Sequence, residues 1–234
     1  MKRGQDPAFL LAGSDRAQNR GNVMYRLYWS RNTGAFAVEA ALALAGAEYE
    51  LVPVDTRAGA HRQDDYLKIN PRMQVPTLRL PDDTVMTESA AILIHLSDLF
   101  PEAGLLPAVG TAERAQAYRW LVFMAANVYE ADLRYFYAER YAGEGGNIRA
   151  VREAALGHLD HNLGILAAYM AGRDTVLASG WSLCDVYLTM LCQWHPDKQR
   201  LYGDHAALKA CTVRTLAQPT IAQVAAQHPE LAAQ

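Results

Sequence analysis

A turn that ends in proline, followed by a short hairpin and a helix, most constrains how this chain can fold. The Val75-Pro76 pair precedes an alternating run at residues 76–80, and residues 81–84 have the composition of a tight turn before a helix that begins at Glu88-Ser89. A cis bond at Val75-Pro76 would expose the backbone N–H and C=O of Val75 for strand-like pairing with an extended ligand. The sequence therefore predicts a frame that can hold a small peptide.

The predicted helix over residues 89–99 begins with two polar side chains of complementary chemistry. The Ser89 hydroxyl and the first helical N–H groups can bind a carboxylate, and Glu88 beside them can accept an ammonium group. A γ-glutamyl group carries both of these charges on one carbon. Serine at this position can also serve only to cap the helix, which is its commoner use at a helix start.

Composition limits the classes of protein to which the chain can belong. A chain of 234 residues, 51% of them hydrophobic, can build one large domain or two small ones. The net charge of −3, with both signs mixed, argues against nucleic acid as the main partner. No apolar run approaches the roughly 18 residues that a membrane span needs. The three cysteines lie in apolar helical patterns without a Cys-x-x-Cys motif, which predicts buried thiols in a reducing, cytoplasmic compartment.

The first half of the chain alternates between two periodicities. Strand-like and helical runs follow one another up to Pro101 in the order β-α-β-α-β-β-α, which fits a small mixed sheet covered by helices. This pattern predicts a first domain over residues 23–102 and a linker over residues 103–110. Residues 1–22 are expected to be an extension outside the fold, either disordered or a remnant of cloning.

The second half of the chain, residues 111–234, has helical periodicity throughout. A long, bent helix is predicted over residues 111–141, and a second striped helix ends near Met170. Ser182 and Asp185 have the spacing of a capping box at the start of another helix, a structural role. The sequence therefore predicts an all-helical second domain.

These features together resemble the glutathione transferase family. The run at residues 70–78 is similar to its loop and cis-proline segment, and residues 88–93 are similar to its γ-glutamyl site at the start of the third helix. The resemblance covers about residues 24–230 and implies an α/β thioredoxin-like N-terminal domain followed by an all-α C-terminal domain. It also implies a homodimeric enzyme of the bacterial, cytosolic, detoxifying type, which joins glutathione to a small hydrophobic electrophile and acts without a metal.

The resemblance further implies a set of glutathione-binding residues. The backbone of Val75 pairs with the tripeptide, Glu88 takes its ammonium group and Ser89 its carboxylate. The full implied set is Arg72, Gln74, Val75, Pro76, Glu88 and Ser89.

Catalysis requires that glutathione react as a thiolate. A free thiol with a pKa of about 8.5 is about 3% ionised at neutral pH, and lowering the pKa by about two units takes about 2.7 kcal/mol. A hydrogen bond to the sulfur and a helix N-terminus can supply this energy. The loop before the first helix offers Thr33 as the leading candidate, followed by Ser30 and Asn32, although each of them could merely cap the helix. Gly34 falls where some bacterial members carry cysteine, so mixed-disulfide chemistry is not expected.

Aromatic side chains on the first long C-terminal helix are the candidates for an electrophile pocket. Tyr118 and Tyr129 are selected there, although most aromatics at helical spacing belong to a core. His158 and His161 have no third ligand at a suitable spacing, so no metal site is expected. Two alternatives to conjugation stay open: a glutathione-dependent lyase, isomerase or peroxidase, and a non-catalytic binding or regulatory protein on the same fold.

Overall fold

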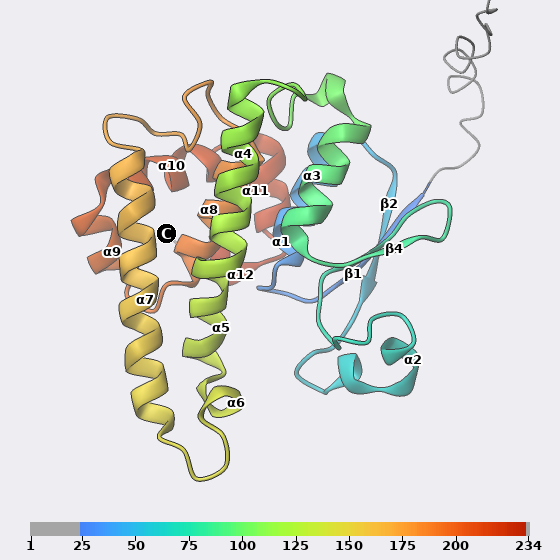
Figure 1. Cartoon of the computed structure of the whole chain (residues 1–234). Helices are drawn as coiled ribbons and strands as arrows, with labels where there is room; N and C mark the ends of the chain where they lie inside the picture. Colours follow the sequence, from blue (N-terminus) through green and yellow to red (C-terminus); the bar gives the residue numbers. More distant parts are fainter. Residues whose placement is uncertain (1–23, 233–234) are drawn as a thin grey trace, which may run out of the picture.

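The structure, a computed structural model, describes residues 24–232, so the predicted extension over residues 1–22 lies outside the described residues. Figure 1 shows the sheet and its helices on the right and a larger group of helices on the left. The sheet has the order β2-β1-β3-β4, in which β1 and β2 are parallel and the other pairs are antiparallel. The predicted thioredoxin-like N-terminal part is confirmed. Its elements are β1 (Tyr25–Trp29), α1 (Ala35–Leu44), β2 (Tyr49–Pro53), the short η1 (Ala60–Arg62), α2 (Asp64–Leu67), β3 (Thr77–Arg79), β4 (Val85–Met86) and α3 (Ser89–Leu99).

The central strand β1 is positioned by alternating side chains. Tyr25 and Leu27 are buried, while Arg26 between them is exposed, as the period of two in a strand requires. Leu27 lies opposite Leu51 of β2 and Leu78 of β3, which fixes the register on both sides. The strand predicted at residues 25–29 forms with the expected bounds. The helix predicted at residues 89–99 also forms with the expected bounds.

The helical part begins after a short 3₁₀ turn, η2 (Pro101–Ala103), and no strand follows in the described chain. Figure 1 shows α7 beside α4 and α5, with α8 behind them. The elements of this part are α4 (Ala112–Phe123), the π-helical segment η3 (Met124–Tyr129), α5 (Glu130–Phe136), α6 (Ala138–Ala142), α7 (Ile148–Tyr169), α8 (Leu183–Trp194), α9 (Lys198–Asp204), α10 (Ala206–Leu216), α11 (Pro219–Ala225) and α12 (Pro229–Ala232).

The predicted bent helix over residues 111–141 is divided at two points. A π-helical segment, η3, separates α4 from α5, and Tyr137 leaves helical geometry between α5 and α6 with φ −121° and ψ 39°. A π turn contains more residues than an α turn, so it rotates the side chains that follow it relative to those before it. This rotation determines which aromatics of the segment face the N-terminal part.

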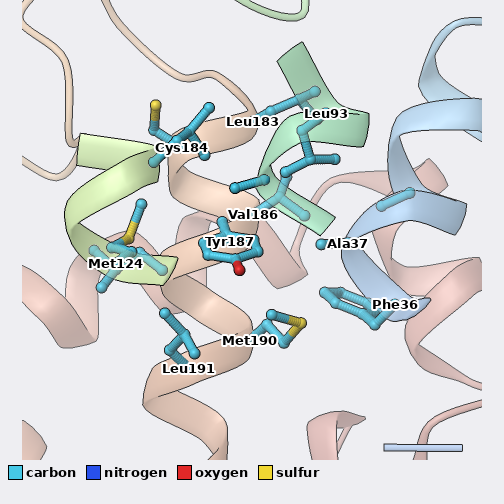
Figure 2. Close-up of a cluster of buried hydrophobic side chains, with 14 of the residues drawn as sticks. Phe36, Ala37, Leu93, Met124, Leu183, Cys184, Val186, Tyr187, Met190 and Leu191 are labelled. Carbon is cyan, nitrogen blue, oxygen red and sulfur yellow. The ribbon is translucent and has the colours of Figure 1, made fainter. Parts of the chain in front are cut away.

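Helix α8 forms the centre of the hydrophobic core. All residues from Leu183 to Gln193 are buried, so this helix is enclosed on every side. Figure 2 shows Val186 and Tyr187 facing Leu93 of α3 and Phe36 of α1. The contact between the two parts of the chain is therefore part of the core itself.

The predicted capping box at the start of α8 is confirmed. The Ser182 Oγ accepts a hydrogen bond from the Cys184 N–H at 3.2 Å, and the Asp185 carboxylate accepts one from the Ser182 N–H at 2.8 Å. The other Asp185 oxygen accepts from the Val176 N–H at 2.8 Å. Asp185 therefore satisfies two buried backbone donors at once and ties the preceding loop to the helix.

The three cysteines are buried, as the sequence predicted. Cys184, Cys192 and Cys211 are buried free thiols. Burial raises the pKa of each, which disfavours the reactive thiolate. Within residues 24–232, none of the helices is both long enough and apolar enough to cross a membrane.

We expect Asp185→Ala to lower the free energy of unfolding by about 2 kcal/mol or more, because it leaves two buried N–H groups without acceptors. Urea denaturation followed by circular dichroism measures this loss. Thr111→Ala is the control, because Thr111 caps the exposed start of α4 through one bond to Arg114 N–H. Thr111→Ala should lower the free energy of unfolding by about 1 kcal/mol. Equal losses for the two variants would contradict a special structural role for Asp185.

Candidate functional site

A cavity of about 680 Å³ lies where the sheet-containing part meets the helical part. It has a polar wall from the N-terminal part and a largely aromatic wall from the helical part. The polar wall includes Asn32, Thr33, Arg72, Gln74, Val75, Pro76, Glu88 and Ser89, and the opposite wall includes Ala125, Tyr129, Leu133, Phe136, Tyr137, Tyr187 and Trp194. Six residues selected for peptide binding from the sequence thus line one wall.

The segment before β3 is held by buried polar groups. The Val75–Pro76 peptide bond is cis, as expected. The Asn70 side-chain amide and the Tyr66 hydroxyl both donate to the Gln74 carbonyl, at 2.8 and 2.7 Å. These two bonds fix the chain just ahead of the proline, so that Val75 and Pro76 line the cavity in a defined position.

Three predicted side chains meet at one rim of the cavity. The Arg72 Nε donates to the Gln74 Oε1 at 3.2 Å and lies 3.9 Å from the Glu88 Oε1. Arg72 and Glu88 are both exposed, so their charges are available to a ligand. The structure therefore brings together a cation, an amide and a carboxylate, which suits a zwitterionic ligand.

Ser89 does not cap its helix. Glu88 occupies the cap position of α3 with a positive φ of 64° and no side-chain capping bond, and Ser89 is the first helical residue. Ser89 is 7% exposed, and its Oγ lies 3.0 Å from the hydroxyl oxygen of Tyr187 on α8. The local interpretation of Ser89 as a cap is thus wrong, and its partner comes from the other half of the chain.

Tyr187 is a site residue that sequence reasoning missed. Its ring is buried, and burial raises the pKa of its phenol, while the hydrogen bond with Ser89 lowers it in part. The hydroxyl therefore stays protonated beside Ser89. Tyr187 lies in an apolar helical pattern that predicts only a core position, so no local signal could have found it.

Both hydroxyl groups of the loop Ser30–Gly34 already form hydrogen bonds within the protein. The Thr33 hydroxyl donates to the Ser30 carbonyl at 2.8 Å and accepts from the Ala35 N–H at 3.3 Å. The Ser30 and Thr56 hydroxyls lie 3.0 Å apart. Asn32 and Thr33 line the cavity, whereas Ser30 is not among the lining residues.

Asn32 is connected to the far end of the chain. Its backbone N–H donates to the Nδ1 of His228 at 3.0 Å, and the Nε2 of His228 lies 3.6 Å from a carboxylate oxygen of Glu39 on α1. His228 and Glu39 are both fully buried. Asn32 has φ 53°, a left-handed conformation that asparagine tolerates better than most residues. The C-terminal segment therefore sets the shape of the loop, which the sequence did not reveal.

The two candidate pocket tyrosines are separated by the structure. Tyr129 lines the cavity, but Tyr118 does not; its ring lies against the Arg114 guanidinium at 4.9 Å. The sequence selected both as aromatics of one predicted long helix, some of which were expected to line an apolar pocket. The π-helical segment between them rotates the later part of the helix, and only Tyr129 faces the N-terminal part.

Cationic side chains surround the cavity. Arg57, Arg62 and Arg140 belong to its lining in addition to Arg72. Burial, together with Arg62 and Arg140, lowers the pKa of His61. On the opposite wall, burial raises the pKa of Asp132 well above its usual value, which favours its uncharged form. The field around the site therefore favours an anion.

The described part of the chain contains no cluster of three or more histidine, cysteine, aspartate or glutamate side chains that could hold a metal ion. His158 and His161 are both exposed on α7. The polar groups of the cavity are instead amides, hydroxyls and charged groups of both signs.

Comparison with known proteins agrees with this geometry. Residues 24–98 match the family described as glutathione S-transferase, N-terminal domain. The chain is 31% identical over 209 residues to the uncharacterized GST-like protein YncG of Escherichia coli K12, which covers 86% of this chain and 97% of that protein. It is 26% identical over 170 residues to the glutathione S-transferase GstA of Escherichia coli O157:H7, covering 72% and 81% of the two chains. A shorter match, 36% identical over 85 residues, covers 36% of this chain and 39% of maleylacetoacetate isomerase from Pseudomonas aeruginosa.

Solved structures show the same architecture. A glutathione transferase homolog from Sulfitobacter, crystallised with bound glutathione, superposes with a TM-score of 0.79 at 27% identity and covers 88% of this chain and 98% of its own. The similarity thus includes the helical part as well as the sheet. This protein belongs to the glutathione transferase family.

Proposed function

We propose that this protein is a glutathione transferase that activates glutathione as a thiolate for attack on a hydrophobic electrophile. The observation that carries the proposal is the single cavity in which Arg72, Gln74, Glu88 and Ser89 lie opposite an aromatic wall. One bound tripeptide could therefore contact the polar residues and still lie beside the apolar surface of the aromatic wall. Its relative GstA, a glutathione S-transferase, supports the same activity.

The polar wall matches the charges of glutathione. In this proposal the Glu88 carboxylate takes the γ-glutamyl ammonium, and the N-terminus of α3 with the Ser89 hydroxyl takes the adjacent carboxylate. Val75 pairs through its backbone with the middle of the tripeptide, as an added strand would. Arg72 and Gln74 complete the rim, where they already contact one another.

The sulfur of a tripeptide bound in this way reaches the start of α1. The first N–H groups of a helix carry a partial positive charge that stabilises an anion. Thr33 is the loop hydroxyl of the proposed thiolate site, because it lines the cavity where Ser30 does not, and Asn32 lies next to it. A thiolate there would compete with the Ser30 carbonyl for the Thr33 proton.

The electrophile is proposed to lie against the aromatic wall. Leu133, Phe136, Tyr137 and Trp194 offer apolar surface to one side of the thiolate position. The same proposal includes a homodimeric state and a cytoplasmic location. Analytical ultracentrifugation measures the oligomeric state. The buried free thiols are compatible with a reducing compartment.

A second candidate function is a glutathione-dependent isomerisation. The match to maleylacetoacetate isomerase favours it, although that match covers only 36% of this chain. A thiolate that adds to a conjugated double bond and then leaves would use the same glutathione site. Turnover of maleylacetoacetate without net consumption of glutathione distinguishes this reaction from conjugation to chlorodinitrobenzene.

A calorimetric titration with glutathione, combined with thiolate absorbance as a function of pH, tests the proposed function. The expected result is binding with a thiol pKa lowered by about two units from its free value of about 8.5. Binding without a lowered pKa would indicate a carrier instead of a transferase. Absence of binding at millimolar glutathione would show that this chain keeps the fold without the chemistry.

Ser89→Ala should weaken glutathione binding by about tenfold, because the ligand carboxylate loses a hydrogen-bond donor. Calorimetry measures the affinity, and thermal unfolding checks that the fold persists. Ser97→Ala is the matched control, since Ser97 is buried in the same helix and donates only to the Leu93 carbonyl. An unchanged affinity in Ser89→Ala would remove Ser89 from the site.

Thr33→Ala should raise the thiol pKa of bound glutathione by up to about one unit, because one hydroxyl donor is lost. The pH dependence of thiolate absorbance measures this shift. Thr33→Ser retains the hydroxyl and should keep the wild-type pKa. A pKa that is the same in all three proteins would assign the loop contribution to Asn32 or to backbone N–H groups.

A further inference from the structure

Gly34 makes an unusually close approach to the helical part of the protein. Its φ of −56° is an ordinary helical value, so backbone conformation does not require glycine here. A Cβ at this position would lie 3.0 Å from the Tyr129 hydroxyl oxygen and 3.1 Å from the Pro76 Cδ. Tyr129 or Pro76 would have to move by a few tenths of an ångström to admit a side chain. The Tyr129 hydroxyl therefore lies directly against the start of α1, beside the cis-proline.

The ring of Tyr129 is fixed from behind by two aromatic residues of α8. It packs edge-on against Trp194, with ring centroids 5.3 Å apart and an interplanar angle of 87°. The ring of Tyr187 lies 6.5 Å away on the same helix. Tyr129 is also the last residue of the π-helical segment η3, which turns it toward the N-terminal part. Its hydroxyl is thus held in place before any ligand binds.

The Tyr129 phenol keeps a proton that it can donate. Burial raises its pKa, and Tyr187 and Asp132 raise it further, while a hydrogen bond with the Gly34 backbone lowers it in part. A bond from the Gly34 N–H uses an oxygen lone pair and leaves the phenolic hydrogen free. None of the side-chain hydrogen bonds formed among residues 24–232 uses that hydrogen.

The hydroxyls of the loop are less available. Thr33 already donates its proton to the Ser30 carbonyl, and Ser30 is engaged with Thr56 away from the cavity lining. A thiolate would have to break the Thr33 bond before it could gain a new one. The Tyr129 hydroxyl also lies at the start of α1, against Gly34, and a new hydrogen bond from it requires no such exchange.

We propose that the Tyr129 hydroxyl is the principal hydrogen-bond donor to the thiolate of bound glutathione. This assignment rests on the proposed function, because the sulfur position follows from pairing of the tripeptide with Val75 beside Pro76. The thiol proton is released to water, and the phenol donates to the sulfur without losing its own proton. Tyr129, selected from the sequence for the electrophile pocket, then acts on the nucleophile instead.

The proposal explains why residue 34 is glycine. A side chain at this position and the Tyr129 hydroxyl would compete for one space. Thiolate stabilisation then depends on both parts of the chain, because the helix N-terminus comes from α1 and the donor comes from the end of η3. The electrophile would bind beyond Tyr129, against Phe136 and Trp194.

Tyr129→Phe tests the assignment by removing one oxygen atom. The thiol pKa of bound glutathione, measured by ultraviolet absorbance in the full chain, should rise by about 1–2 units. Binding of S-methylglutathione, which cannot ionise, should be unchanged, and this shows that the site is intact. Tyr169→Phe is the control, because Tyr169 packs on Trp120 and does not line the cavity. It should leave the pKa at the wild-type value.

Gly34→Ala provides an independent second variant. Its Cβ should displace the hydroxyl and raise the thiol pKa, and combining it with Tyr129→Phe should add no further increase, because both changes remove one interaction. Gly157→Ala on α7, where a Cβ meets open space, controls for the substitution itself. Additive shifts in the double variant would contradict the proposal.

The outcomes separate this inference from the proposed function. A wild-type protein with a lowered thiol pKa, combined with an unchanged pKa in Tyr129→Phe, would overturn the role of Tyr129 and leave the transferase function in place. A wild-type protein that binds glutathione with an unshifted thiol, or does not bind it, would overturn both.

Discussion

The packing of α8 against α1 and α3 is the contact on which the rest of the structure depends. This helix is buried along its length, and Figure 2 shows its side chains between those two helices and Met124. Because α1 and α3 carry the two helix starts that face the cavity, the position of α8 sets the distance between the polar wall and the aromatic wall. Tyr187 serves both walls, since its hydroxyl contacts Ser89 and its ring lies behind Tyr129. A change in the core of α8 is therefore also a change in the site.

The C-terminal segment makes a second connection between the two parts of the chain. His228 accepts a hydrogen bond from the backbone of Asn32 and lies beside the buried Glu39 of α1. A further bond joins the Gln227 amide to Glu39 at 2.8 Å. The Nε2 of His228 and the facing Glu39 oxygen are buried 3.6 Å apart without a hydrogen bond between them. The Gln227 amide and the Asn32 backbone therefore supply the hydrogen bonds of this cluster. The loop that faces the proposed sulfur position is thus held by residues nearly two hundred positions away, which gives the helical part direct control over its shape.

Local sequence patterns predicted the elements well and the long-range contacts poorly. The strand at residues 25–29, the helix at residues 89–99 and the Ser182–Asp185 capping box form as expected, because alternation, helix starts and capping involve neighbouring residues. The grouping of Arg72 with Glu88 could also be inferred, since a short hairpin brings these segments together. Tyr118 and Tyr129 were selected together, and periodicity could not reveal the π-helical segment that begins between them.

The sequence by itself determined the order of strands and helices and the helical second half, because both follow from local periodicity. It also determined the residues of the polar wall, through a short motif that resembles the glutathione transferase family. Only the tertiary structure decided which groups complete the site. Ser89 meets Tyr187 across 98 positions of sequence, and Gly34 meets Tyr129 across a boundary between two parts of the fold. Such contacts arise from the packing of whole helices, and a single side chain in a helical pattern looks the same whether it fills the core or faces a cavity.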